Sequence, residues 1–226
     1  MIPSPARLIC LLFLLFSGFP LFGGTTYQRV LFLGNSITKH GPKADIDWTG
    51  DWGMAASSAE KDYVHLVISG LATRNGTHPE VRVRNIADFE RSHADYDVAG
   101  KLGEFIDFHP DLIILAIGEN VPAPKDDSAV TTFRNEVIRL LKTIQGDTGA
   151  TIVVRSGFWA NEAKDRALAE ASSSVGGVFV DLSALSKDES LYARSEREFK
   201  HAGVANHPGD KGMAAIASAI LAALPQ

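Results

Sequence analysis

Three polar residues that lie far apart in the chain have side chains suited to acyl transfer: Ser36, Asn120 and His207. A serine hydroxyl is a poor nucleophile at neutral pH until a neighbouring imidazole removes its proton. The tetrahedral intermediate that then forms carries an oxyanion, and the side-chain amide of an asparagine can donate a hydrogen bond to it. We therefore consider Ser36 a candidate nucleophile, His207 a candidate general base and Asn120 a candidate oxyanion donor.

Each of these residues also has an ordinary structural interpretation. A serine that follows a strand can cap a helix, and an asparagine can hydrogen-bond the backbone of its own loop. His207 stands beside a Pro-Gly turn, where it can be a surface histidine, and His201 competes with it for the role of base. The choice depends on whether the fold brings the three candidates together.

The hydrophobic pattern alternates between strand-like and helix-like segments along the chain. Short apolar or alternating runs predict strands at residues 29–33, 81–86, 112–117, 151–154 and 178–180. Apolar residues at helical spacing predict helices at 62–74, 130–144, 162–172 and 212–224, and a shorter helix around 102–106. This alternation predicts an α/β fold with a five-stranded parallel sheet covered by helices on both faces.

Two of the candidates follow the ends of predicted strands, which is where ligands bind in folds of this kind. Ser36 comes shortly after the first strand, Asn120 shortly after the third, and His207 shortly before the last helix. The pattern therefore predicts that Ser36, Asn120 and His207 meet at one edge of the sheet.

Three short blocks around these residues resemble those of the SGNH (GDSL-like) hydrolases. Residues 34–38 read Gly-Asn-Ser-Ile-Thr and resemble the first block of the family, Gly-Asp-Ser-Ile-Thr. Residues 118–121 read Gly-Glu-Asn-Val and resemble its Gly-x-Asn-Asp block, and the His-Pro pair at 207–208, followed by Gly212, resembles its final block. The blocks stand in the family's order, and the resemblance spans about residues 29–224.

The resemblance implies a three-layer α/β/α flavodoxin-like sandwich with a Ser36 nucleophile and a His207 base. It also implies an oxyanion hole, formed by the backbone N–H of Ser36, a backbone N–H of the second block, expected at Glu90, and the side chain of Asn120. Chemistry of this kind needs no metal and no organic cofactor, so none is expected.

Departures from the family pattern leave the third member of the site open. Val204 stands three residues before His207, where the family usually has an aspartate. Glu90 stands at the glycine position of the second block, and Asn35 replaces the aspartate of the first. Glu119 and Glu90 are the candidate orienting acids on the expected rim loops. The alternative, which we favour, is a plain Ser–His dyad in which a backbone carbonyl holds the imidazole N–H.

Aromatic residues near the candidate nucleophile suggest a sugar-binding surface. Residues 39–61 form a long insertion after the first strand, and Trp48 and Trp52 lie in it among glycines. Trp159 follows the fourth predicted strand. These three indole rings are candidate platforms for a carbohydrate, although tryptophans in an insertion can equally be its core anchors.

The first part of the chain predicts export. Arg7 precedes an uninterrupted apolar run at 8–16 and then a stretch of small residues, a pattern typical of a secretory signal peptide. We therefore expect a signal peptide at 1–24 and an SGNH hydrolase-like domain at 25–226, in a secreted or periplasmic protein. The apolar run is shorter than a membrane span, so no stable membrane insertion is expected after cleavage; an uncleaved anchor is the alternative.

Composition excludes several other classes of protein. The 226 residues carry a net charge of −5 without any run of basic residues, which argues against nucleic acid as a partner. The single cysteine excludes a disulfide framework and a zinc–thiolate site within one chain.

These observations predict a serine esterase that hydrolyses short acyl esters, above all acetyl esters on carbohydrates, through a Ser-His acyl-enzyme mechanism. The expected partner is a small-molecule or polysaccharide ester substrate. Two alternatives stay open: a lipase, lysophospholipase or thioesterase that acts on lipid-like esters, and a noncatalytic glycan-binding protein on the same scaffold.

Overall fold

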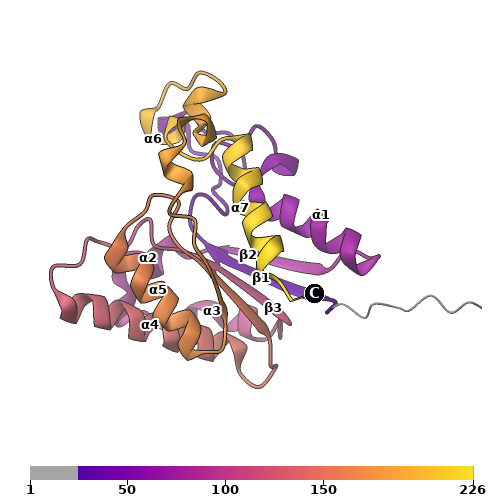
Figure 1. Cartoon of the computed structure of the whole chain (residues 1–226), viewed down its shortest axis with the longest axis vertical. Coiled ribbons are helices and arrows are strands. Elements are labelled where there is room, and N and C mark those ends of the chain that lie inside the picture. Colours follow the sequence, from indigo (N-terminus) through magenta and orange to yellow (C-terminus); the bar gives the residue numbers. More distant parts are fainter. Residues whose placement is uncertain (1–24, 226) are drawn as a thin grey trace, which may run out of the picture.

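The computed structural model describes residues 25–225, so the signal peptide expected at 1–24 lies outside the described residues. Five parallel strands form one sheet in the order β2-β1-β3-β4-β5 (Figure 1). Their bounds are β1 (Arg29–Gly34), β2 (Glu80–Asn85), β3 (Leu112–Ala116), β4 (Thr151–Arg155) and β5 (Val178–Val180). The predicted five-stranded parallel sheet is therefore confirmed.

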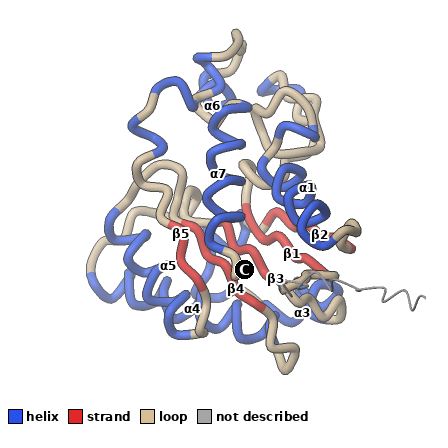
Figure 2. Tube along the Cα trace, turned by 45° about the vertical axis from the view of Figure 1, so that its right-hand side comes forward, coloured by secondary structure: helices blue, strands red, loops and turns tan. Residues whose placement is uncertain are grey.

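Helices cover both faces of this sheet, as Figure 2 shows. One face carries α1 (Tyr63–Asn75) and α7 (Asp210–Ala223). The other face carries α2 (Ala87–Ser92), α3 (Val98–Ile106), α4 (Asp127–Gln145) and α5 (Glu162–Ser174). The short α6 (Ala202–Ala205) lies outside these layers, just before α7. The result is the predicted three-layer α/β/α sandwich.

The strand β1 shows how the sequence pattern builds the layers. Leu31 and Leu33 face the core under α2 to α5, while Val30 and Phe32 face the core under α1 and α7. Successive side chains of a strand point to opposite faces, so a strand that is apolar throughout must be covered on both. The central strand β3 is buried along its whole length for the same reason.

Two segments next to the carboxyl ends of the strands form what we call the cap: residues 39–61 and residues 193–206 (Figure 1). They share a small core of their own, made of Trp48, Met54, Ala55, Ala193 and Val204. The cap joins the chain just after Ser36 to the chain just before His207.

Most predicted strands and helices agree with the structure to within a few residues, but α2 and α6 were not predicted. Both helices are short, and the N-cap position of α2 holds Ile86, whose apolar side chain gives no capping signal. Among residues 25–225, no helix is both long enough and apolar enough to cross a membrane.

Candidate active site

The turn that follows β1 presents Ser36 at the carboxyl edge of the sheet. Its hydroxyl Oγ lies 2.9 Å from Nε2 of His207, so these two residues form a hydrogen-bonded pair. The turn is tight, because the Thr38 N–H donates to the Asn35 carbonyl at 3.0 Å. A Cβ atom on Gly34 would fall 1.8 Å from Thr38 Oγ1, so this turn requires glycine at position 34.

His207 is held in the orientation that a general base needs. Its Nδ1 lies 2.7 Å from the carbonyl oxygen of Gly203, which can only accept, so Nδ1 carries the hydrogen and Nε2 accepts from Ser36. Trp159 packs edge-on against the imidazole, with the ring centroids 5.6 Å apart. Burial lowers the pKa of His207, and the Gly203 carbonyl and the charge of Glu119 oppose part of that shift. The neutral, proton-accepting imidazole is therefore favoured.

The contact with Gly203 decides between the alternatives for the orienting group. Within residues 25–225, the carboxylates of Glu119 and Glu90 hydrogen-bond to other groups and not to His207, so the expectation that one of them orients it is wrong. The dyad with a backbone carbonyl fits this geometry. The competing histidine, His201, caps α6 instead, with its Nδ1 accepting from the Gly203 N–H at 3.1 Å.

Asn120 lies in the loop after β3, with its side-chain amide fixed at both ends. Its Oδ1 accepts from Arg91 Nη2 at 3.2 Å, and its Nδ2 donates to Glu90 Oε2 at 2.8 Å. An amide nitrogen carries two hydrogens, so one of them is left for another acceptor. The amide orientation is also defined, because the guanidinium of Arg91 can only donate.

Glu90 does not supply the backbone donor that the resemblance implied. Its N–H donates to the Ile86 carbonyl at 3.2 Å at the start of α2, so the expectation that it faces an oxyanion is wrong. The physical reason is the helix at 87–92, in which backbone N–H groups bond to carbonyls four residues earlier. The carboxylate is buried instead, and it accepts from the N–H groups of Gly118 at 2.8 Å and Asn120 at 3.0 Å.

Glu119 and Arg155 form a buried ion pair at the same edge of the sheet. Arg155 Nη1 lies 2.6 Å from Glu119 Oε1, and the two side chains are 0% and 4% exposed. The same oxygen accepts from the Phe158 N–H at 2.8 Å, and Glu119 Oε2 accepts from Asn35 Nδ2 at 2.7 Å. These additional hydrogen bonds offset part of the desolvation penalty of burying a charge pair.

The two buried carboxylates differ in pKa. Burial raises the pKa of Glu90, and the charge of Glu119 raises it further, against hydrogen bonds from Asn120 and Gly118. Burial, the largest influence, would raise the pKa of Glu119, but the charge of Arg155 and the hydrogen bonds from Phe158, Arg155 and Asn35 together outweigh it, so the pKa of Glu119 is lowered. Glu119 is therefore the more firmly ionised of the two.

The carboxylates near the site do not gather into a metal centre. Within residues 25–225, no group of three or more His, Cys, Asp and Glu side chains could hold a metal ion. The oxygens of Glu90 and Glu119 instead accept from N–H donors, among them the guanidinium of Arg155.

The three predicted tryptophan platforms lie in two different places. Trp159 lies at the Ser–His pair, whereas Trp48 and Trp52 lie in the cap, packed edge-to-face with ring centroids 5.7 Å apart. Trp48 is only 7% exposed, and its Nε1 donates to the His40 carbonyl at 2.9 Å. Trp52 Nε1 donates to the Ala56 carbonyl at 3.1 Å. Both rings therefore also anchor the cap.

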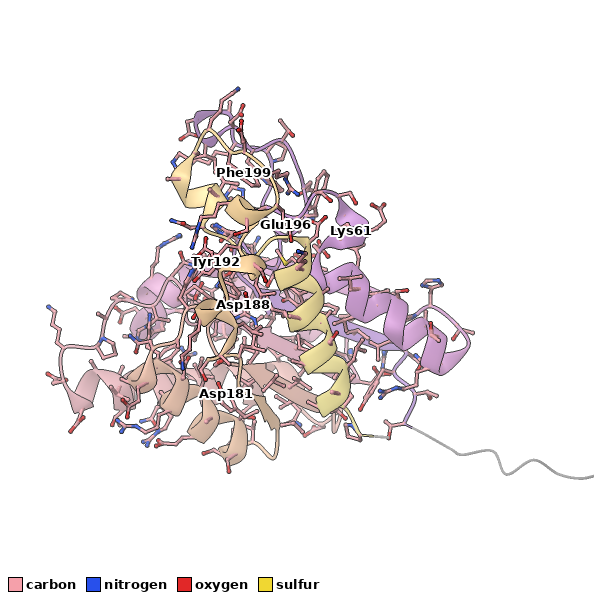
Figure 3. The ribbon with its side chains drawn as sticks, turned by 45° about the horizontal axis from the view of Figure 1, so that its top comes forward. Lys61, Asp181, Asp188, Tyr192, Glu196 and Phe199 are labelled. Carbon is pink, nitrogen blue, oxygen red and sulfur yellow. The ribbon has the colours of Figure 1, made fainter. Side chains whose placement is uncertain are left out.

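A cavity of about 600 Å³ lies between the two segments of the cap. Trp48, Trp52 and Phe199 give it an aromatic lining, and Figure 3 shows Phe199 beside the 39–61 segment. Polar side chains complete the lining: Asp47, Ser57, Arg197, Glu198, Lys200 and His201. Neither Ser36 nor His207 lines this cavity. The 39–61 segment is joined to the Ser36 turn, because the Met54 N–H donates to the Ser36 carbonyl at 2.8 Å, and α6, in the other segment, lies just before the candidate base.

The buried contacts of Asn35, Glu90 and Arg155 were not predicted from the sequence. One signal was available, because Arg155 ends an otherwise apolar strand whose burial requires its charge to be paired. In the sheet, Arg155 is the register partner of Ala116 on β3, and Glu119 follows that strand. The strand order, which the sequence pattern did not reveal, is what places the acid within reach.

No family model and no curated protein matches the chain. Several solved structures, however, match it in fold. A protein described as a GDSL-like lipase from Parabacteroides merdae ATCC 43184 has a TM-score of 0.58 at 17% identity, over 88% of this chain and 95% of that one. A protein described as an SGNH hydrolase from Slackia heliotrinireducens has a TM-score of 0.52 at 14% identity, over 87% and 98%. The acetyl xylan esterase AlAXEase has a TM-score of 0.51 at 15% identity, over 86% and 98%.

At such identities the likeness concerns the fold and does not transfer an activity. It covers nearly all of the described residues, from the first strand to the last helix. The resemblance of the three sequence blocks thus extends to the whole architecture: this chain has the fold of the SGNH, or GDSL-like, hydrolases.

Proposed function

We propose that this protein is a serine esterase that hydrolyses carboxylic esters through an acyl-enzyme. One observation carries the proposal: Ser36 Oγ lies 2.9 Å from Nε2 of His207, while Nδ1 of the same ring is held 2.7 Å from the Gly203 carbonyl. This is the relationship of nucleophile, base and orienting acceptor that acyl transfer by a serine requires.

The reaction has two halves, acylation and deacylation, and in each His207 Nε2 takes one proton and gives it back, the last one to Ser36. His207 Nε2 takes the proton of Ser36 as the hydroxyl oxygen attacks the ester carbonyl. The free amide hydrogen of Asn120 and the backbone N–H of Ser36 stabilise the oxyanion. The C–O bond to the alcohol then breaks, and the alcohol leaves with the proton from His207. Water, deprotonated by the same nitrogen, hydrolyses the acyl-enzyme and releases the acid.

We propose an acetyl or other short acyl ester on a carbohydrate as the substrate. The cap cavity supports this class, because about 600 Å³ suits a small ligand, and its lining combines aromatic with polar side chains. Amphipathic indole rings pack well against the apolar faces of sugars, and Trp159 lies against the candidate base itself. One protein with the same fold is named as an acetyl xylan esterase.

The two alternatives differ from this proposal in what they require of the site. A lipase, lysophospholipase or thioesterase needs an apolar surface for its acyl chain, whereas charged side chains such as Arg197 and Lys200 line the cap cavity. A glycan-binding protein without activity needs the cavity but has no need of the Ser36–His207 contact. The contact therefore favours an enzyme, and the cavity lining favours a polar alcohol portion.

We also propose that the protein acts outside the cytoplasm, as a secreted or periplasmic enzyme. The support is the sequence pattern of residues 1–24 alone. Amino-terminal sequencing of the exported protein tests it, because a mature chain that retains residues 1–24 would contradict cleavage.

Acetate release from a panel of acetylated oligosaccharides tests the activity and the substrate class together. The proteins compared are the wild type, Ser36→Ala and a matched control, Ser174→Ala. Ser174 is an exposed serine at the end of α5 whose hydroxyl donates to the Glu170 carbonyl, so its loss should leave hydrolysis unchanged. Labelling by a fluorophosphonate, which reacts with activated serines, is followed in the same three proteins.

Release and labelling that are lost only in Ser36→Ala would support the whole proposal. Hydrolysis of long-chain esters without release of acetate from sugars would contradict the carbohydrate substrate and favour a lipid-like one. A wild-type protein that neither turns over esters nor takes the label would overturn the esterase and favour the glycan-binding alternative.

A further inference from the structure

Four buried polar side chains next to the Ser–His pair have no role in the reaction described above: Asn35, Glu90, Glu119 and Arg155. Asn35, Glu90 and Arg155 are 0% exposed, and the side chain of Glu119 is 4% exposed. Buried polar groups cost free energy unless they are hydrogen-bonded. The hydrogen bonds that these four side chains make therefore indicate what the group holds in place.

Asn35 joins the two buried carboxylates. Its Nδ2 donates to Glu119 Oε2 at 2.7 Å and to Glu90 Oε1 at 3.3 Å, which uses both of its hydrogens. Its Oδ1 accepts at 3.1 Å from the N–H of Ile37, the residue directly after Ser36. The amide is therefore fixed in one orientation, and it connects the nucleophile turn to both acids.

Glu90 connects the same turn to the loop that carries the candidate oxyanion donor. Its Oε1 accepts from the N–H groups of Gly118 and Asn120, and its Oε2 accepts from Asn120 Nδ2. One carboxylate thus holds both the backbone and the side chain of Asn120. Through Asn35, that carboxylate also contacts the turn of the nucleophile.

The residue type at position 35 follows from this arrangement. An ionised aspartate there would present only acceptors to Glu90 and Glu119, which are themselves acceptors. It would also add a third negative charge to a network whose guanidinium, that of Arg155, already pairs with Glu119. Asparagine supplies the two N–H donors that the carboxylates need.

We propose that Asn35, Glu90 and Glu119 are positioning residues that hold the Ser36 turn and the Asn120 loop in reactive geometry. The two buried carboxylates therefore require asparagine, rather than the aspartate of the first block, at position 35. This inference rests on the proposed esterase function, because the reactive geometry matters only if Ser36 attacks an ester.

An exchange of donor and acceptor between positions 35 and 119 tests the network. Asn35→Asp places an acceptor against Glu119 Oε2, and Glu119→Gln places a donor against Asn35 Nδ2. In the double variant, the new amide nitrogen at position 119 faces the new carboxylate at position 35, and the new amide oxygen still accepts from Arg155 and Phe158. The matched control is Glu170→Gln on α5, which alters an exposed ion pair with Arg134.

We expect each single variant to lower kcat for acetyl ester hydrolysis about a hundredfold, because small displacements of reacting groups have effects of that size. KM should change little, since neither side chain contacts the substrate. The double variant should recover about tenfold of kcat relative to the worse single variant, because the two substitutions interact directly. The recovery is partial, since the carboxylate introduced at position 35 still faces Glu90. Unfolding by urea and circular dichroism show which variants fold, and Asn35→Ala replaces Asn35→Asp if the latter does not.

Two results would overturn the network: single variants with wild-type kcat, or a folded double variant no better than the worse single one. If Asn35→Ala folds and Asn35→Asp does not, a wild-type kcat in Asn35→Ala would likewise overturn the network. Failure of the proposed function looks different, because the wild-type protein would then show neither Ser36-dependent turnover nor fluorophosphonate labelling. That result would overturn the esterase and, with it, the positioning role.

Discussion

Nδ1 of His207 lies 2.7 Å from the carbonyl oxygen of Gly203, four residues earlier in the chain. The carbonyls in the last turn of a helix have no partner within it, and the one-turn helix α6 therefore offers this oxygen to the imidazole. A carbonyl does not titrate, so the orientation of His207 does not depend on the protonation of a third side chain. Val204 stands where SGNH hydrolases usually have an aspartate. Since His207 needs no such aspartate here, Val204 can pack in the core of the cap.

Val204→Asp should therefore destabilise the protein and not complete a triad. Val204 is 2% exposed and packs with Trp48 and Met54, so an aspartate there would be a buried and unpaired charge. We expect a loss of roughly 3–5 kcal/mol in the free energy of unfolding, measured by urea titration, with no gain in kcat. A stable variant with a raised kcat would contradict this account of the orienting carbonyl.

The activity should persist into mildly acidic solution. Because burial lowers the pKa of His207, the imidazole stays neutral and able to accept a proton below the ordinary histidine value of about 6.5. The acid limb of kcat/KM should accordingly have its midpoint below about pH 6.5, as measured with a chromogenic acetyl ester whose own chemistry is insensitive to pH there. A midpoint above that value would contradict the assignment of the base or of its surroundings.

Glu119→Gln should move that acid limb further down in pH. The charge of Glu119 raises the pKa of His207, although the two side chains are not hydrogen-bonded, so removing the charge lowers this pKa. Glu170→Gln, which removes an exposed acid on α5, should leave the midpoint in place. An upward movement of the midpoint in Glu119→Gln would show that this carboxylate acts on the base in some other way.

Asn120→Ala should lower kcat by about 10²–10³, the effect of removing one donor from an oxyanion hole. Arg91→Ala should have a smaller effect, because Arg91 only fixes the oxygen end of the same amide. The measurement is kcat and KM for one acetyl ester with the wild type, Asn120→Ala and Arg91→Ala. Equal effects of the two substitutions would argue that the amide stabilises the loop and does not contact the reacting carbonyl.

Arg155→Met should be among the most destabilising substitutions at the edge of the sheet. It leaves Glu119 buried without its charge partner, and breaking such a pair costs roughly 3–5 kcal/mol. Arg134→Met removes the partner of Glu170 in an exposed pair and should cost at most about 1 kcal/mol. Free energies of unfolding from urea titration check both values, and similar losses in the two variants would contradict the burial of the Arg155–Glu119 pair.

The sequence predicted the layers of this fold because most of its elements are long and strongly patterned. The short apolar run of β3 has the length of a buried strand, the helical spacing of α4 continues over several turns, and the structure has both elements. The helix α2 was not predicted because six residues are too few for a periodicity to show, and Ile86 at its N-cap position has no polar side chain. Its packing against the sheet stabilises it, which is tertiary information.

In the candidate site, too, some residues could be predicted from the sequence and others could not. Ser36 and Asn120 could be selected from their chemistry and their places after predicted strands, and His207 from its chemistry and its place before the last helix. The structure places Ser36 against His207. The prediction that the Glu90 backbone N–H is an oxyanion donor was wrong because α2, in which this N–H is bonded, was not predicted. The partners of Arg155 and the orienting carbonyl of Gly203 could not be predicted, because they depend on strand order and on a single helical turn.

Ser36 and His207 are 171 positions apart in the chain. During synthesis the candidate nucleophile therefore leaves the ribosome long before the candidate base, and β2, β3, β4 and β5 are made in between. A nascent chain carries a serine without its imidazole until translation is nearly complete. The order of the residues alone thus prevents the Ser36–His207 contact in every incomplete chain that ends before His207.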